Sequence, residues 1–139
     1  MQEVTLHVRI KQTADGRTDE TKQTHEGKGT AKGNGWYFTY KEELEEAGSV
    51  NTVYKIEDGM VSLIRQGQLQ MKQLFVKGRT SESVYHSPYG MFEMETHTSK
   101  LSVKSEGERP ERISIAYQLW MNKQYVGSFE LELQAEWND

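Results

Sequence analysis

The chain has 139 residues, a net charge of −4 and a pI near 5.6; 35% of its residues are hydrophobic and 27% are charged. This length suits one domain, covering residues 1–139, that buries roughly two thirds of the surface its unfolded form exposes. Its Lys and Arg residues are scattered along an acidic chain rather than clustered. Binding to nucleic acid or to an anionic membrane requires a clustered basic face, so we expect neither partner.

The absence of cysteine removes disulfides, thiolate nucleophiles and cysteine-ligated metals. The first residues, "MQEVTLHVRI", have the pattern of a strand rather than of a signal peptide. No apolar run approaches the roughly 20 residues that a membrane helix needs. The four histidines lack the close spacing of a metal-binding pair. We therefore expect a cytoplasmic, soluble protein without a metal or a cofactor.

Alternation of apolar and polar residues predicts a series of strands. In the first, Val4, Leu6, Val8 and Ile10 share one face. Further strands are expected from Arg17 into the thirties and at 36–41, 51–57, 60–66, 69–77, 83–87, 91–97, 100–104, 111–121 and 124–135. Tight turns are expected at Asp15-Gly16, Asp58-Gly59 and Asn122-Lys123. The segment 42–48, "EELEEAG", predicts the one short helix, ended by Gly48.

Ten or so short strands joined mainly by hairpins indicate an all-β domain. A sheet of this size with one apolar face per strand curls, and closure removes the exposed edges that favour aggregation. The first choice is a closed antiparallel up-and-down β-barrel with one short helix, and the second is a β-sandwich.

The stretch "MVSLIRQG" at 60–67 raises the question of function, because Arg65 follows Val61 and Leu63 on an inward face. In a meander, Arg65 and Glu42 lie at the same end of the barrel, and Tyr40 precedes Glu42 on the same face. A guanidinium offers a fork of donors that suits a carboxylate or phosphate, and phenols add neutral donors.

Three hypotheses remain open. In the first, one end of the barrel binds a small polar or anionic ligand. Its site residues are Tyr40, Glu42, Arg65, Tyr85, Tyr89 and Tyr117. In the second, Arg65 pairs with Glu42 inside a filled barrel, and the protein is a structural or interaction module whose outer aromatic patch includes Trp120 and Tyr125. In the third, the protein is an enzyme with Glu42 as a base and Arg65 as an electrophilic anchor. A monomer and a homodimer are both compatible with the sequence.

Four short motifs carry a family resemblance. They are "YKE" at 40–42, "RQG" at 65–67, "YHSPYG" at 85–90 and "YQL" at 117–119. In this order, they resemble the YwiB-like bacterial proteins of unknown function. Ser87 stands where the family carries a threonine, which keeps the hydroxyl group. The resemblance spans about Val4 to Leu133 and implies a calycin-like, lipocalin-type closed barrel. It implies no activity.

Overall fold

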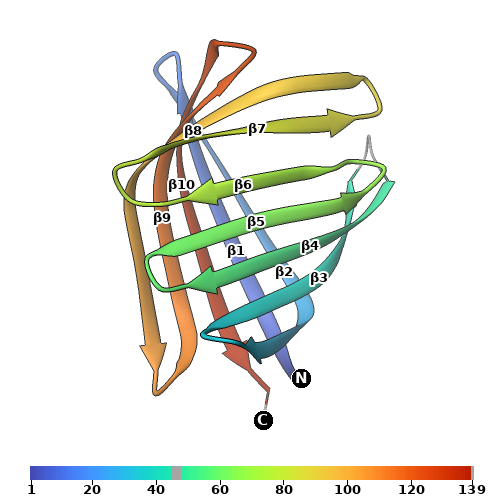
Figure 1. Cartoon of the computed structure of the whole chain (residues 1–139), viewed down its shortest axis with the longest axis vertical. Coiled ribbons are helices and arrows are strands. Elements are labelled where there is room, and N and C mark those ends of the chain that lie inside the picture. Colours follow the sequence, from blue (N-terminus) through green and yellow to red (C-terminus); the bar gives the residue numbers. More distant parts are fainter. Residues whose placement is uncertain (45–47, 139) are drawn as a thin grey trace.

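The computed structural model describes residues 1–44 and 48–138, and these residues form ten strands. The strands are β1 (Gln2–Ala14), β2 (Arg17–Lys32), β3 (Gly35–Leu44), β4 (Gly48–Glu57), β5 (Met60–Gly67), β6 (Met71–Phe75), β7 (Thr80–Ser87), β8 (Gly90–Glu106), β9 (Arg109–Met121) and β10 (Gln124–Trp137). They belong to one antiparallel sheet with the order β6-β5-β4-β3-β2-β1-β10-β9-β8-β7. Sequential strands are therefore neighbours, and β1 and β10 join the two halves of the meander (Figure 1).

The sheet curls until its two outer strands, β6 and β7, approach each other. The ring closes there through an isolated bridge, in which Gln70 and His86 exchange two backbone hydrogen bonds of 2.8 Å. Gly78 and Arg79, between β6 and β7, also bond to the backbone of Thr98 in β8. The fold is thus an all-β, nearly closed barrel, and the expectation of full closure is only partly confirmed.

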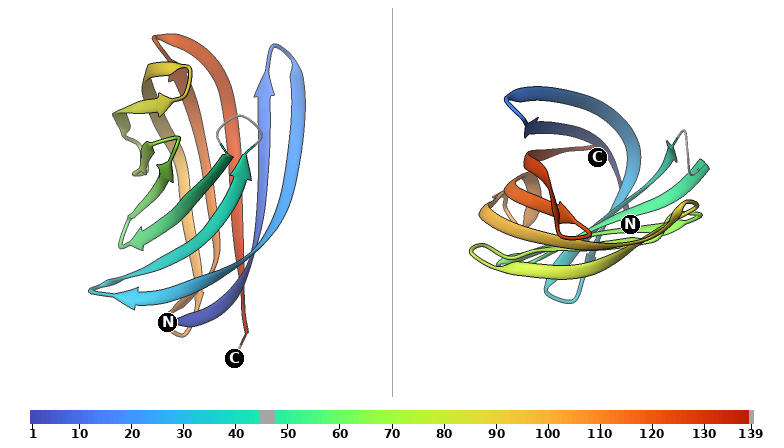
Figure 2. Two further views of the ribbon diagram at one scale, coloured as in Figure 1. Left: turned by 90° about the vertical axis from the view of Figure 1, so that its right-hand side faces the viewer. Right: turned by 90° about the horizontal axis from the view of Figure 1, so that it is seen from above.

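A second opening lies between β2 and β3. The two strands pair over Lys28–Lys32 and Gly35–Thr39, whereas the rest of β2, residues 17–27, pairs with β1 alone. The β1–β2 hairpin consequently stands away from β3 and β4 (Figure 2). Between Arg17 and Thr24 every residue is exposed, so this half of β2 buries neither face.

The predicted helix at 42–48 is wrong. Glu42 to Leu44 continue β3 and Gly48 begins β4, with Glu43 opposite Ser49 and Leu44 opposite Gly48. Residues 45–47 lie outside the described residues. No helix among the described residues is long and apolar enough to cross a membrane.

The separate strands predicted at 91–97 and 100–104 are a single strand, β8. The register with β9 shifts between Thr98 and Lys100, so Ser99 forms a bulge. A bulge inserts one residue without ending a strand, and it interrupts the alternation from which the two segments were predicted.

The core consists of the inward faces of the strands, and its largest fully buried side chains include Tyr54, Phe38, Phe75 and Leu6. At the end of the barrel near the chain termini, Trp137 packs edge-on against Trp36, with ring centroids 5.3 Å apart. Its ring also covers Gly29, and its indole N–H donates to the Pro110 carbonyl at 3.0 Å. This end is filled by aromatic rings, which leaves the opposite end for a site.

Candidate functional site

The interior of the barrel holds a cavity of about 390 Å³. Its polar lining residues are Tyr54, Arg65, Gln73, Tyr85 and Tyr117. The remaining lining residues are aliphatic residues, methionines and phenylalanines from β1, β5, β6, β8, β9 and β10. An apolar space with a few converging polar groups is the usual character of a small-molecule site.

An ion pair lies beside this cavity. Arg65 Nε is 3.3 Å from Glu42 Oε1, and Glu42 is only 4% exposed. Thr52 on β4 lies opposite Arg65 in one ladder and opposite Tyr40 in the other, and its hydroxyl donates to Glu42 Oε1 at 2.6 Å. Arg65 and Glu42 therefore lie together, as alternation and the meander predicted, and they form the ion pair of the second hypothesis.

The guanidinium is incompletely bonded. Although the distance between Arg65 Nε and the Glu42 carboxylate is that of an ion pair, the buried Nε–H makes no hydrogen bond of acceptable geometry within the described residues. Nε lies close enough to the Glu42 carboxylate for a hydrogen bond, but its N–H bond does not point at the carboxylate oxygen. Arg65 lines the cavity whereas Glu42 does not, so the cavity is exposed to the positive partner of the pair.

Three phenols surround the pair. Tyr40 and Tyr54 lie nearly parallel, with ring centroids 6.3 Å apart and a side-chain hydrogen bond between them. Burial raises the pKa of Tyr40, of Tyr54 and of Tyr117 above the ordinary value for a phenol, and the nearby Arg65 charge only partly offsets this. All three phenols therefore remain protonated near neutral pH and can donate hydrogen bonds without adding negative charge.

The strand next to β5 carries an amide. Gln73 on β6 donates from Nε2 to Thr96 Oγ1 at 3.0 Å and also bonds with the Tyr117 hydroxyl. Tyr117 in turn packs between Phe75 and Phe129, at centroid distances of 4.9 and 5.1 Å. These contacts fix the position of the phenol at the cavity wall.

The six predicted site residues have different positions. Arg65, Tyr85 and Tyr117 line the cavity, and Tyr85 also packs edge-on against Phe92. Glu42 and Tyr40 are buried but do not line this cavity, and Tyr40 stacks between His25 and Tyr54. Tyr89 is 72% exposed in the β7–β8 turn, and the structure does not bring it to the other five residues.

The sequence prediction missed Tyr54 and Gln73. Gln73 follows Leu69 and Met71 at alternate positions and precedes Phe75, so it is a polar residue on an inward face, which is the signal that identified Arg65. Tyr54 alternates in the same way between Thr52 and Ile56. Both residues could have been found by applying the same criterion to every strand.

A family model described as a domain of unknown function, DUF1934, matches residues 6–133. The chain belongs to the DUF1934 family. Like the sequence motifs, this match covers nearly the whole chain, and it confirms the predicted resemblance. The description of DUF1934 assigns no activity, so membership alone does not say what the cavity holds.

This DUF1934 chain is similar to the uncharacterized beta-barrel protein YwiB of Bacillus subtilis strain 168. The two sequences are 35% identical over 117 residues, which cover 84% of this chain and 80% of YwiB. Its fold is similar to that in a crystal structure of YwiB, with a TM-score of 0.84 and 25% sequence identity over 99% of this chain and 93% of the other. The β-barrel architecture is thus shared across the alignment.

Proposed function

We propose that this protein binds a small amphipathic anion in the barrel. The apolar part of the ligand occupies the cavity of about 390 Å³, and its anionic group pairs with Arg65. The observation that carries the proposal is Arg65, the one charged residue among those that line the mainly apolar cavity in the described part of the chain; its buried Nε–H makes no well-aligned hydrogen bond there, although Nε lies 3.3 Å from Glu42 Oε1. A buried donor without a partner is costly, and an acceptor brought by a ligand would relieve that cost.

The charge of the wall supports an anion rather than a cation. Arg65 lines the cavity, whereas the carboxylate of Glu42 does not line it and is bonded to Thr52. The guanidinium has five N–H donors, so the contact with Glu42 leaves others available. Tyr54 and Tyr117, protonated for the reason given above, add neutral donors.

The apolar lining supports an amphipathic ligand. Leu119, Met121 and Phe129 are among the apolar residues that face the cavity. A small inorganic anion would leave this surface without a partner. A ligand with an apolar body gains about 25 cal/mol for each Å² of apolar surface removed from water.

The test uses 8-anilinonaphthalene-1-sulfonate, which combines an apolar body with one anionic group. Saturable fluorescence enhancement is expected for the unchanged protein and at least tenfold weaker binding for Arg65→Met, because a hydrogen bond to a charged group contributes about 1.5–3 kcal/mol. Arg79→Met, at an exposed arginine between β6 and β7, is the matched control and should bind the probe as before.

Displacement of the bound probe by other compounds separates the contribution of charge to binding from that of apolar contact. Decanoate should displace the probe at much lower concentration than 1-decanol, which has a similar chain without the charge. Equal displacement by the two compounds, or unchanged probe affinity in Arg65→Met, would refute the anionic part of the proposal. The double variant Glu42→Gln/Arg65→Met protects this test against misfolding, because it leaves no unpaired carboxylate.

The filled-barrel alternative predicts a different outcome. Trp120 and Tyr125 form an edge-on pair on the β9–β10 hairpin, with centroids 5.5 Å apart, and Tyr125 is 53% exposed. If this pair serves a partner protein and the cavity serves no ligand, the unchanged protein shows no saturable probe binding. Native mass spectrometry of the purified protein would then also show no mass beyond that of the chain.

A further inference from the structure

The free edge of β2 is the most unusual feature outside the cavity. Residues 17–27 form a regular strand that pairs with β1 without a register shift, yet no strand of the described residues pairs with the other side of this segment. β3 joins β2 only from Lys28 onward. His25 stacks on Tyr40 near the point where the strands separate, with centroids 4.3 Å apart. Figure 2 shows the β1–β2 hairpin standing clear of β3 and β4 beyond that point.

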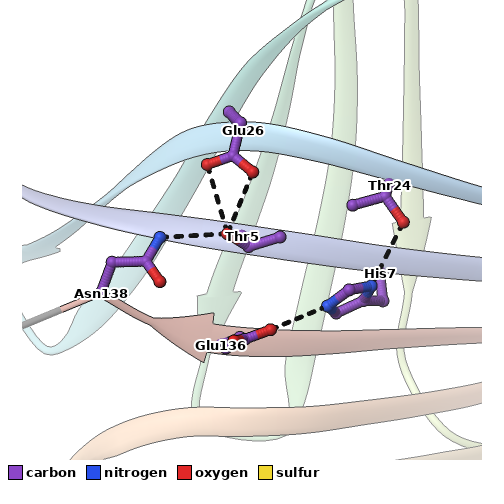
Figure 3. A network of polar contacts seen from close by, with 6 residues as sticks. All are labelled: Thr5, His7, Thr24, Glu26, Glu136 and Asn138. Carbon is purple, nitrogen blue, oxygen red and sulfur yellow. Dashed lines mark hydrogen bonds and ion pairs between the residues drawn. The ribbon is translucent and has the colours of Figure 1, made fainter.

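Side chains on the outer face of this segment make hydrogen bonds and an ion pair with side chains of β1. Thr5 donates to both carboxylate oxygens of Glu26 at 3.1 and 3.2 Å, and His7 Nδ1 lies 3.2 Å from Thr24 Oγ1 (Figure 3). Farther along, Arg9 Nη1 lies 4.0 Å from Glu20. These contacts order the strand but leave its backbone edge accessible.

Proteins usually protect such an edge. Prolines, bulges and charged side chains, especially lysine, are common devices that prevent pairing with another chain. Between Arg17 and Glu26 there is no proline and no glycine, the register is continuous, and the threonines at 18, 21 and 24 favour a strand. The segment does carry charges, but Glu20 and Lys22 have opposite signs, so a pairing that places one opposite the other is not opposed by charge.

We infer that this edge pairs with the same edge of a second copy of the chain, antiparallel about a two-fold axis at Thr21. Residues directly opposite each other in a ladder share a face, so the axis of a symmetric antiparallel pair passes through a residue and its own copy. An axis at Thr21 places Glu20 of each copy opposite Lys22 of the other. Both of these outer-face charges are then matched, and Thr18 faces Thr24.

The neighbouring registers are less favourable. An axis at Glu20 or at Lys22 places a charge opposite its own copy, and an axis at Gln23 places Glu20 opposite Glu26. Like charges directly opposite each other are destabilising. An axis at Thr24 would match Lys22 with Glu26 and Glu20 with Lys28. It needs the edge at Gly27 and Lys28, which β3 already occupies: Lys28 lies opposite Thr39, and a Cβ at Gly27 would lie 2.5 Å from the Thr39 carbonyl oxygen.

The contact is small, because one strand pair buries less than the roughly 1,200–2,000 Å² of a standard interface. A dimer that dissociates on dilution is therefore expected. Exposed charge pairs are screened by salt, so the dimer should also weaken as ionic strength rises.

Analytical ultracentrifugation over a range of concentrations tests the pairing. Glu20→Lys and Lys22→Glu each convert both matched pairs into like-charge pairs, and each should weaken the dimer roughly tenfold or more. Lys22 is 75% exposed at its side chain, and the fold of each variant can be checked by circular dichroism.

Mixing the two variants gives the decisive result. In the mixture, the lysine introduced at position 20 of one chain faces the glutamate introduced at position 22 of the other. The unchanged Lys22 of the first chain faces the unchanged Glu20 of the second, so a heterodimer should form with about the affinity of the unchanged protein. The double variant Glu20→Lys/Lys22→Glu should likewise dimerise.

Three results would overturn the inference: a protein that is monomeric at every concentration, a dimer insensitive to both reversals, or a mixture that stays monomeric. The cavity binding proposed above is unaffected by any of these outcomes.

Discussion

Replacing Arg65 by methionine tests the ion pair inside the barrel. Methionine keeps the length of the aliphatic stem but removes the guanidinium, which leaves Glu42, only 4% exposed, with the Thr52 hydroxyl as its remaining partner within the described residues. Removing one partner of a buried pair typically destabilises a protein by about 3–5 kcal/mol. The Arg65 side chain is 21% exposed, so solvent already screens the pair and the lower end of that range, about 3 kcal/mol, is expected.

This loss is measurable by urea denaturation and by thermal melting. For a chain of 139 residues, an unfolding entropy of about 2.1 cal/mol/K per residue gives a fall in Tm of roughly 10 °C for about 3 kcal/mol. Glu42→Gln should destabilise less, by about 1–2 kcal/mol, since glutamine keeps an oxygen for Thr52 and the partly exposed guanidinium can reach water.

The double variant shows whether Arg65 and Glu42 stabilise the fold as a coupled pair. Arg65→Met/Glu42→Gln removes both charges, and its loss of stability should be smaller than the sum of the two single losses because no unpaired buried carboxylate remains. If the two single losses add within about 0.5 kcal/mol, the residues do not interact energetically, and the account of the site as a coupled pair is refuted. Arg79→Met, exposed and remote from Glu42, should leave the melting temperature unchanged.

Three other features of the barrel can be tested singly. Leu119→Trp should fill part of the cavity and abolish probe fluorescence without unfolding the barrel, whereas Gln118→Trp, exposed on the other face of β9, should leave binding intact. Gly29→Ala should destabilise by about 1–3 kcal/mol, because a Cβ at that position would lie 2.5 Å from the Trp137 ring; Thr30→Ala, one position along, should have a much smaller effect on the melting temperature. Absorbance titration should show that three of the seven tyrosines ionise above pH 10 in the folded protein, since burial raises the pKa of Tyr40, Tyr54 and Tyr117. The folded state then binds more protons than the unfolded state above pH 10, so unfolding free energy should fall there; normal ionisation of all seven would contradict this.

The position of Arg65 could be predicted because it depends on two simple regularities. Alternation determines which face a residue occupies, and the up-and-down order of a meander determines which end of the barrel it reaches. Glu42 and Arg65 therefore came together although 22 intervening residues separate them. The same reasoning gave the wrong position for Tyr89, because this residue lies in a turn, where alternation no longer applies. Its backbone N–H instead bonds to the Ser87 hydroxyl at 3.1 Å.

The wrongly predicted helix shows that pairing between strands can override the preference of individual residues for a helix. Glutamate, leucine and alanine favour a helix in isolation, but Glu43 and Leu44 pair with β4 and extend β3. The opening between β2 and β3 could not be predicted, because the length over which two strands pair depends on the curvature of the whole sheet. The polar residues on both faces of 17–24, all exposed in the structure, were the only trace of it in the sequence.

The polar groups beside the cavity are difficult to explain by stability alone. Apolar replacement of a buried ion pair is often neutral or stabilising, and an unfilled space forfeits packing contacts that a larger side chain would supply. Here an Arg–Glu pair, an Nε–H without a well-aligned acceptor among the described residues, and a cavity of about 390 Å³ occur at one place. The poorly bonded Nε–H and the unfilled space each cost stability, and a ligand with an apolar body and an anionic group would compensate both. A double variant Glu42→Gln/Arg65→Met that is stable yet no longer binds the probe would assign the guanidinium to binding, whereas one that is stable and binds as before would leave it a purely structural role.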